Sequence, residues 1–311
     1  MSGRLTRLNR TRKSGAPVSS TLCGRSMNAK LRMYRTGLNA SRNYIVDEEP
    51  GYIYPICLEV FRDPNELTRE HVPPRSTGGK VLCLLCRACN STAGSSMDAA
   101  LHERAEAARV MSIGTSRRFL QLKTGEISVN ASLKHEGTNA AFQIEARHND
   151  PANVEQFRTL LQTPRPESHI QVWYPNLFNQ HYALVGYLKV AYLYAFAKFG
   201  YGYILRDCMD QVRRQIQNPK TRQIWKWWLR RNENQDKTML YLCDRPLNCL
   251  AVGVAEHIII LPSLQEPHDQ YDVVRDLTEG KNVDELTGQF HLTHSFPAPI
   301  KMEMLCDRTA A

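Results

Sequence analysis

The stretch Leu67-Thr-Arg-Glu-His-Val-Pro-Pro-Arg-Ser-Thr-Gly-Gly-Lys80 decides the local fold of this 311-residue chain. Two consecutive prolines bar a helix and favour extended backbone before them, so the sequence predicts that His71 closes a short strand and leads into a loop. A histidine at a strand end, beside the Glu70 carboxylate, is suited to general-base work because its unperturbed pKa lies near neutrality. Taken alone, a Glu-His pair is more typical of an ordinary loop.

The segment that follows contains Leu85-Cys-Arg-Ala-Cys-Asn90, in which Cys86 and Cys89 form a Cys-x-x-Cys pair. Two thiolates at this spacing can hold one Zn²⁺ from a tight turn, and tetrahedral closure needs two more ligands. Cys57, in Cys57-Leu-Glu-Val-Phe61, is the obvious third ligand. A second Cys-x-x-Cys pair would need a cysteine at position 54, where the chain has Tyr54.

The identity of a fourth zinc ligand is therefore open. Cys83 or Cys23 could supply it, the metal could be held by three thiolates, or the site could have lost its metal. For each thiol taken alone, the alternative is a buried, unbridged cysteine that packs as a small apolar residue.

The order of these elements is far more specific than any one of them. The pattern Cys…Leu-Thr-x-Glu-His-Val-x-Pro-x-x-x-Gly-Gly…Cys-x-x-Cys-Asn-x-x-x-Gly resembles the HNH endonuclease family, over about residues 52–101. The resemblance implies an α+β protein that begins with a small ββα-metal module. In such a module a β-hairpin and a helix clasp one divalent cation, and a zinc knuckle holds them together.

The resemblance also assigns roles to single residues. His71 matches the general base that deprotonates the attacking water, and Glu70 and Asn90 match the ligands of the catalytic cation. Oxygen ligands suit Mg²⁺ or Mn²⁺ better than they suit zinc, while thiolates suit Zn²⁺, so two metals with different tasks are expected. The matching structural zinc ligands are Cys57, Cys86 and Cys89.

The chain departs from the family pattern in one more place, because there is no Asn between His71 and Asn90. That residue supports the loop after the histidine rather than taking part in the chemistry, so the assigned roles stand without it. Asp98 and His102, on helical sequence just downstream, are reserve ligand candidates for which capping and surface roles are the favoured interpretation.

Charge and composition divide the chain into three predicted regions. Residues 1–46 hold ten Lys or Arg and no acidic residue, which accounts for the net charge of +9, and we expect a flexible basic arm there. Nucleic-acid binding, an organelle transit peptide and a solvated tail all explain such an arm. Residues 47–112 form the predicted nuclease module, and residues 113–311 form a larger α+β domain of unknown role.

Periodicity predicts one helix at the end of the nuclease module and the elements of the larger domain. Antiparallel strands are expected from alternating runs at residues 118–122, 127–133, 141–146, 239–262 and about 300–305. Helices are expected at residues 98–109, 153–162, 180–199 and 203–217, of which the last two form a long helical pair. Four aromatic residues of the helix predicted at 180–199 are expected to pack in the core rather than to stack on bases: Tyr187, Tyr192, Tyr194 and Phe196.

Composition excludes several classes of protein. Hydrophobic residues make up 42% and charged residues 23%, which is typical of a globular chain. No run of about 18 uninterrupted apolar residues could span a membrane, and no apolar signal segment opens the chain, so we expect a cytoplasmic protein without a membrane partner. Nine cysteines in close spacing favour reduced thiols or metal ligands over disulfides.

These observations predict an enzyme, a metal-dependent endonuclease that hydrolyses the phosphodiester bonds of DNA by a one-metal HNH mechanism, with RNA open as an alternative substrate. The resemblance further implies defence against foreign DNA, in which the C-terminal domain binds protein partners. One alternative is a non-catalytic zinc-knuckle protein that binds nucleic acid. The other is a partner- or ligand-sensing protein in which the nuclease module is an accessory.

Overall fold

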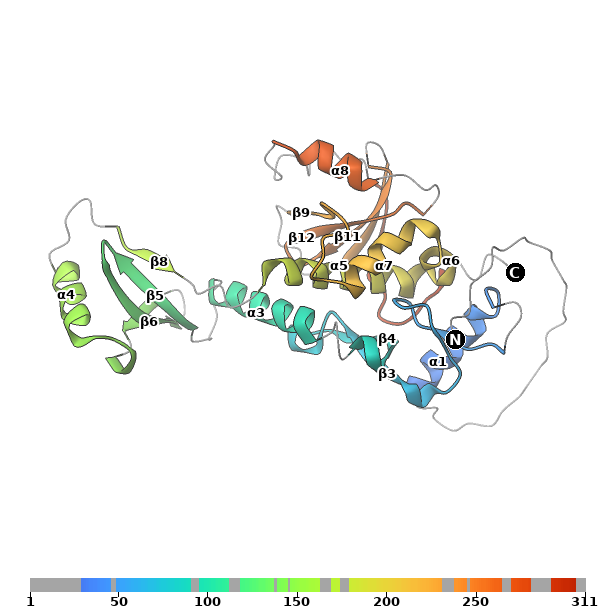
Figure 1. The fold of residues 1–311 in the computed structure, drawn as a ribbon, viewed down its shortest axis with the longest axis horizontal. Coiled ribbons are helices and arrows are strands. Elements are labelled where there is room, and N and C mark those ends of the chain that lie inside the picture. Colours follow the sequence, from blue (N-terminus) through green and yellow to red (C-terminus); the bar gives the residue numbers. More distant parts are fainter. Residues whose placement is uncertain are drawn as a thin grey trace.

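A computed structural model shows a mixed fold of helices and antiparallel sheets, as the α+β prediction requires (Figure 1). The structure describes residues 29–45, 49–90, 95–111, 118–136, 139–144, 146–162, 169–173, 179–230, 238–244, 247–264, 270–280 and 292–305. No helix in these ranges combines the length and apolar character that crossing a bilayer requires.

Two small hairpins and three helices make up the first part of the molecule. The helices are α1 (Ala29–Ser41), α2 (Arg87–Cys89) and α3 (Ser95–Met111). The hairpins are antiparallel and pair β1 (Tyr52–Ile53) with β2 (Val60–Phe61) and β3 (Leu67–Val72) with β4 (Lys80–Cys86). Short 3-10 turns lie at Pro64–Glu66 and Arg75–Thr77. Strand β3 ends one residue after His71, as the double proline predicts.

Helix α1 corrects the prediction of a flexible arm over residues 1–46. Tyr34, Gly37 and Ser41 form one buried face of this helix. The Tyr34 hydroxyl donates to the carbonyl oxygen of Arg62 at 2.6 Å, and a Cβ on Gly37 would meet the Tyr52 ring at 2.3 Å. The contacts of this face are made by small and hydroxyl-bearing side chains rather than by apolar ones. The sequence therefore lacks the apolar periodicity from which a helix is predicted. Residues 1–28 of the predicted arm lie outside the described residues.

The C-terminal part is a five-stranded antiparallel sheet with helices packed on it (Figure 1). The strand order is β13-β10-β11-β12-β9, with β9 (Trp228–Arg230), β10 (Met239–Cys243), β11 (Cys249–Val254), β12 (His257–Leu261) and β13 (Leu292–Pro297). The helices are α5 (Gln180–Phe199), α6 (Tyr201–Ile204), α7 (Asp210–Gln217) and α8 (Gln270–Thr278).

Helix α5 forms where the sequence predicts it and is buried from Ala183 to Phe199, which confirms its aromatic residues as core. The second predicted helix, over residues 203–217, is wrong in its continuity. Arg206 has extended backbone between α6 and α7, and its guanidinium donates to the carbonyl oxygen of Ser263 at 2.5 Å. This tertiary contact outweighs the helical propensity of the segment.

The strand predicted at residues 300–305 is also wrong. The last strand of the sheet is β13, which pairs with β10. The backbone N–H groups of Glu303 and Met304 instead donate to the carbonyl oxygen of Ala197, at 2.6 and 2.9 Å. The segment therefore satisfies a free carbonyl at the end of α5 rather than adding a strand.

A second, smaller sheet has its own hydrophobic core and lies at one end of the molecule (Figure 1). Its order is β7-β6-β5-β8, with β5 (Arg118–Thr124), β6 (Ile127–Glu136), β7 (Asn139–Ile144) and β8 (Gln171–Trp173), and with α4 (Pro151–Gln162) packed on β6. The strands predicted at 118–122 and 127–133 are confirmed, and the strand predicted at 141–146 forms as β7 but ends at Ile144, with Ala146 in a 3-10 turn.

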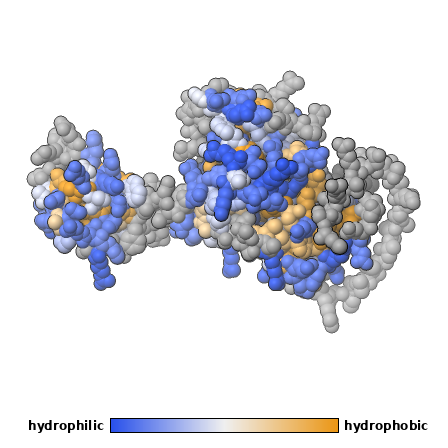
Figure 2. All heavy atoms as spheres, viewed as in Figure 1, coloured by the Kyte–Doolittle hydropathy of each residue, from blue (hydrophilic) through white to orange (hydrophobic). Residues whose placement is uncertain are grey.

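The buried residues form two cores, which do not follow the expected boundary between residues 112 and 113. The larger core joins residues 34–101 to residues 184–304, and the smaller lies within 120–157. The visible face is mostly hydrophilic, with hydrophobic residues gathered where α6 and α7 meet the N-terminal strands (Figure 2). The division into a 47–112 nuclease module and a 113–311 domain stays a prediction.

Candidate metal and active site

The hairpin β3–β4 fixes the position of His71. The chain reverses through Pro73 and returns at Gly79, where a Cβ would lie only 1.4 Å from the carbonyl oxygen of Pro73. Gly78 has φ 87°, a left-handed conformation that side chains disfavour. The Pro-Pro and Gly-Gly pairs of the sequence therefore build a tight loop directly after the histidine.

Three thiols gather at the base of this hairpin. The Sγ atoms of Cys57, Cys86 and Cys89 all lie within 4.8 Å of one another. Cys57 follows β1, Cys86 ends β4 and Cys89 ends α2, so one cation between them would tie both hairpins together. All seven described cysteines are free thiols. The predicted zinc set is thus brought together, and its donors are those that Zn²⁺ prefers.

The cluster is already arranged to carry negative charge. The Cys57 thiol, by hydrogen bonding to Cys89, lowers the pKa of Cys89 to about 6, against the opposing effect of burial. The same interaction raises the pKa of Cys57, and burial raises that of Cys86 to about 11. The thiolate, which Cys89 forms most readily of the three, is the form of cysteine that binds Zn²⁺.

Tyr54 stands at the sequence position where a second Cys-x-x-Cys pair would supply the fourth ligand. Its side chain is fully buried, and its hydroxyl lies beside the Cys89 thiol and helps to lower the pKa of Cys89. Burial raises the pKa of Tyr54 well above 10, and the thiols of Cys89 and Cys86 add to that effect. Cys83 does not join the cluster, since it is buried on β4 opposite Glu70. Cys23 lies outside the described residues.

Glu70 points into the protein rather than toward solvent. The residue is 6% exposed, and Lys189 on α5 places its Nζ 2.8 Å from Glu70 Oε1. The same Nζ lies 3.4 Å from Asp98 Oδ1, on α3. Two carboxylates from the predicted module therefore face one ammonium group from the C-terminal part of the chain.

Burial governs the electrostatics of these three groups. It raises the pKa of Glu70 and of Asp98, because water no longer stabilises their charged forms, and Lys189 partly opposes that rise. Burial disfavours the charged form of Lys189 as well, but Glu70 and then Asp98 outweigh it and raise the pKa of Lys189. The ammonium group is thus held charged between the two acids.

His71 follows Glu70 on β3, and Asn90 is the C-terminal cap of α2. The pairing of β3 with β4 shifts register between Glu70 and His71, a bulge-like irregularity that leaves His71 partly exposed while Glu70 is buried. Asn90 Nδ2 donates to Thr68 Oγ1 on β3 at 3.4 Å. Within the described ranges, no hydrogen bond or ion pair joins the side chains of Glu70, His71 and Asn90 to one another.

Tyrosines on α5 attach the module to the C-terminal part. The hydroxyls of Tyr192 and Tyr194 donate to the carbonyl oxygens of Pro55 and Val72, at 2.5 and 3.0 Å. Tyr201, just after α5, donates to Ile53 at 3.0 Å. These contacts bind the backbone of both hairpins to the C-terminal part, and the contact with Val72 lies next to His71.

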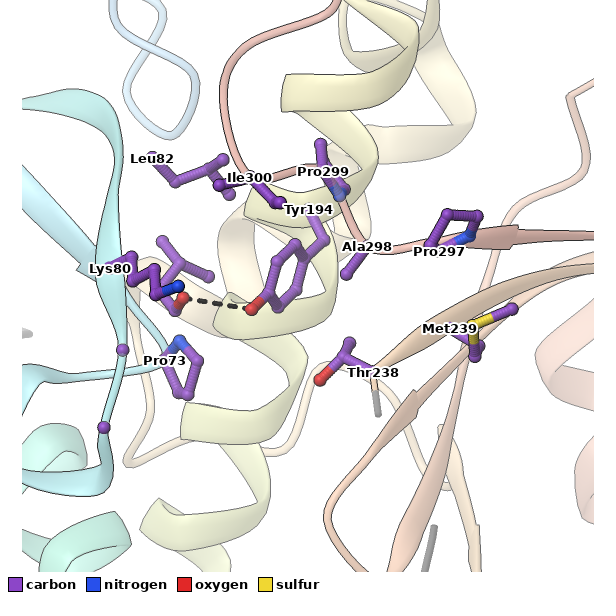
Figure 3. A pocket seen from close by; sticks show the side chains of 13 residues that line it. Pro73, Lys80, Leu82, Tyr194, Thr238, Met239, Pro297, Ala298, Pro299 and Ile300 are labelled. Atoms are coloured by element: carbon purple, nitrogen blue, oxygen red, sulfur yellow. Dashed lines mark hydrogen bonds between the residues drawn. The ribbon is translucent and has the colours of Figure 1, made fainter. Parts of the chain in front are cut away.

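A pocket of about 360 Å³ opens where this attachment meets the loop after the histidine (Figure 3). It lies between Pro73 and Lys80 of the hairpin, Tyr194 of α5 and the segment around Ile300. Figure 3 shows Tyr194 reaching across from α5, with its hydroxyl bonded to the hairpin backbone. The pocket is mostly apolar, and Lys80 is the charged residue in its lining.

Sequence reasoning missed Lys189 and undervalued Asp98. A lysine within an apolar helix carries no local signal of a distant acidic partner, and the interpretation of Asp98 as a capping or surface residue is wrong, since it faces Lys189. His102 has a buried Nδ1 without a hydrogen-bond partner in the described part of the chain. A helical spacing of four residues between Asp98 and His102 was the available signal that this face of α3 is turned inward.

Comparison with known protein families finds a match to the HNH endonuclease family over residues 56–106. This range contains every predicted site residue, and the resemblance is confirmed for this sixth of the chain. The HNH family is generally one of nucleases, which implies nucleic-acid binding by this segment. No curated protein and no solved structure shows a significant match to the chain.

Proposed function

We propose that the chain is a metal-dependent endonuclease that hydrolyses phosphodiester bonds of DNA, with His71 as the general base. The observation that carries the proposal is the Glu70-His71 pair at the end of β3, inside the HNH match, with the imidazole partly exposed. A base must reach the water whose proton it takes, and an exposed ring at a strand end meets that condition.

The residues around His71 support a division of tasks. Glu70 and Asn90 would hold a Mg²⁺ or Mn²⁺ ion, which when bound neutralises charge on the phosphate and the leaving oxygen. His71 accepts the proton of the attacking water. Thr68 orients the Asn90 amide from β3. Zn²⁺ held by the three thiols would fix the hairpins and take no part in hydrolysis.

The substrate and setting are further parts of this proposal. DNA is the favoured substrate, RNA is the alternative, and defence against foreign DNA with protein partners bound by the C-terminal part is the proposed context. The HNH match supports a nucleic-acid substrate, and the ten basic residues of segment 1–46 would add phosphate affinity that weakens steeply with salt.

A second candidate function is favoured by the ion pair at Glu70. A carboxylate that already has a buried ammonium partner is less available to a metal ion, which supports a non-catalytic, zinc-stabilised module that binds nucleic acid. This candidate predicts DNA binding without cleavage in any divalent ion.

The two candidates separate in a cleavage assay on the full-length, zinc-loaded chain. Supercoiled plasmid and a single-stranded RNA are incubated with Mg²⁺ or Mn²⁺ at low salt. We expect nicking by the wild type and a loss of about 100-fold or more in His71→Ala, because a general base contributes about 10²–10⁴-fold. His169→Ala, which changes an exposed histidine far from the hairpin, is the matched control. Equal cleavage by wild type and His71→Ala, or none by either, would refute the proposal.

A further inference from the structure

A basic loop, residues 218–227, joins α7 to β9. It lies within a longer run, residues 211–232, that holds seven Lys or Arg and no acidic residue. Lys220 and Arg222 of the loop are exposed, as is Arg214 on α7. Among the described residues, none of these three side chains makes an ion pair. Their positive charges therefore face solvent rather than a described acidic side chain.

Buried contacts fix the backbone of the basic loop. The buried Gln215 amide on α7 donates to the carbonyl oxygen of Thr221 at 2.9 Å and accepts from the backbone N–H of Gln223 at 2.7 Å. The indole N–H of buried Trp227 donates to the carbonyl oxygen of Leu184 on α5 at 3.2 Å. A ligand that binds the exposed cations would therefore not have to order the loop backbone first.

Trp225 adds an exposed aromatic ring to the same loop. The residue is 51% exposed, although its neighbours Ile224 and Trp227 are each 2% exposed. Lys226, the next residue, places its Nζ 3.5 Å from the centre of the Trp228 ring. Exposed rings stack on bases while cations beside them hold phosphates, which is how proteins bind single-stranded nucleic acid. The combination of an exposed indole with unpaired cations thus fits a nucleic acid better than another polyanion.

The basic loop begins at a contact with the predicted nuclease module. Gln217, the last residue of α7, donates from its Nε2 to the carbonyl oxygen of Ile56 at 2.7 Å. Ile56 directly precedes Cys57 of the thiol cluster, so the loop starts beside the predicted zinc site. DNA that is bound by the module would meet a basic surface there.

We propose that the basic loop is a contact surface for the DNA substrate, in which Lys220 and Arg222 bind phosphates and Trp225 stacks on a base. The inference rests on the proposed function in taking DNA as the substrate. It deepens that function by adding a substrate contact outside the HNH match. Phosphate contacts carry no sequence information, so the loop adds affinity and position rather than base specificity.

The test measures DNA binding by the full-length, zinc-loaded chain without Mg²⁺ or Mn²⁺, so that no metal-dependent cleavage takes place. The fluorescence anisotropy of a labelled duplex with a single-stranded tail gives the affinity over a series of NaCl concentrations. We expect Lys220→Gln/Arg222→Gln to bind at least about tenfold more weakly at low salt. The slope of log affinity against log salt should fall by about 1.4–1.8, since each phosphate contact contributes about 0.7–0.9.

Two matched variants separate the position of these residues from their charge and ring alone. Arg158→Gln/Lys301→Gln removes the same charge from exposed residues elsewhere and should keep the wild-type slope. Trp225→Ala should weaken binding by at least about fivefold, as expected for the loss of one stack between a base and an aromatic ring. Trp173→Ala removes a 47% exposed indole from β8 and should bind as the wild type does.

Acylation of the lysines in the wild-type chain gives an independent result that needs no variant. Saturating DNA should protect Lys220 and leave Lys301 reactive, as measured by mass spectrometry of the digested protein. The inference is overturned if Lys220 reacts equally with and without DNA, or if the two double variants lose the same affinity. An acidic protein as the occupant of the loop would give those same negative results. A plasmid left uncut by the wild type would refute the proposed function and leave the binding results unchanged.

Discussion

Two clusters in the same module meet the need for a cation in different ways. In the thiol cluster, Cys57, Cys86 and Cys89 converge without an ion pair to any described basic side chain, and their sulfur atoms are donors that suit a metal ion. In the carboxylate cluster, Glu70 and Asp98 converge on Lys189, which supplies a positive charge from the protein itself. The comparison shows that converging ligand side chains indicate a cation. Whether that cation is a metal ion or an ammonium group depends on which other side chains the fold places beside them.

The largest effect should come from emptying the thiol cluster. Cys86→Ala removes the ligand at the end of β4, and we expect a loss of zinc and of about 5–10 kcal/mol in the free energy of unfolding, since structural zinc has an apparent binding free energy of about 10–16 kcal/mol. Zinc content and denaturant unfolding measure it. Cys208→Ala, a half-buried thiol outside the cluster, should keep its zinc. Unchanged stability in Cys86→Ala would show that no metal joins the hairpins.

The second-largest loss of stability should come from breaking the ion pairs of the carboxylate cluster. Lys189→Met leaves the buried Glu70 carboxylate without its partner, and breaking such a pair costs about 3–5 kcal/mol. Lys198→Met should cost about 1 kcal/mol, because its partner Glu303 reaches solvent. Urea unfolding measures the stability of the two variants. Equal losses in the free energy of unfolding would mean that the ion pair of Lys189 stabilises the fold no more than that of Lys198.

The helix contact that brings Lys189 into place should give a smaller effect. Gly186→Ala puts a methyl group against Leu101, and overpacking costs about 1–3 kcal/mol, which a gain of about 1 kcal/mol in helix propensity partly offsets. We expect a net loss of about 1 kcal/mol in thermal unfolding. The loss should vanish when the substitution is made in a Leu101→Ala background, and persistence there would locate the clash elsewhere.

The smallest effect is expected at Tyr54, beside the thiol cluster. Tyr54→Phe keeps the buried ring and removes only the hydroxyl beside the Cys89 thiol, so the free energy of unfolding should change by no more than about 1 kcal/mol. Competition with a chelator compares the zinc affinity of the two proteins. A large loss of affinity would mean that the hydroxyl itself binds the metal.

The same comparison shows which features the sequence could predict. The Cys-x-x-Cys spacing and the Pro-Pro and Gly-Gly pairs act through local geometry, so the thiol cluster and the end of β3 after His71 were predictable. The ion pair of Glu70 joins residues more than a hundred positions apart, and no local pattern marks Lys189 as its partner. Helix α1 was not predicted for a related reason, because Tyr34 and Gly37 make their contacts with residues that are distant in the sequence.

The metal content of the full-length wild-type chain, purified with both Zn²⁺ and Mn²⁺ present and then gel-filtered without them, tests the account most directly. Two clusters with different cations, a metal ion at the thiols and the Lys189 ammonium at the carboxylates, predict about one Zn²⁺ per chain and no retained Mn²⁺. Retention of one Mn²⁺ by the wild type, lost in Glu70→Gln, would contradict the claim that Lys189 occupies the carboxylate site.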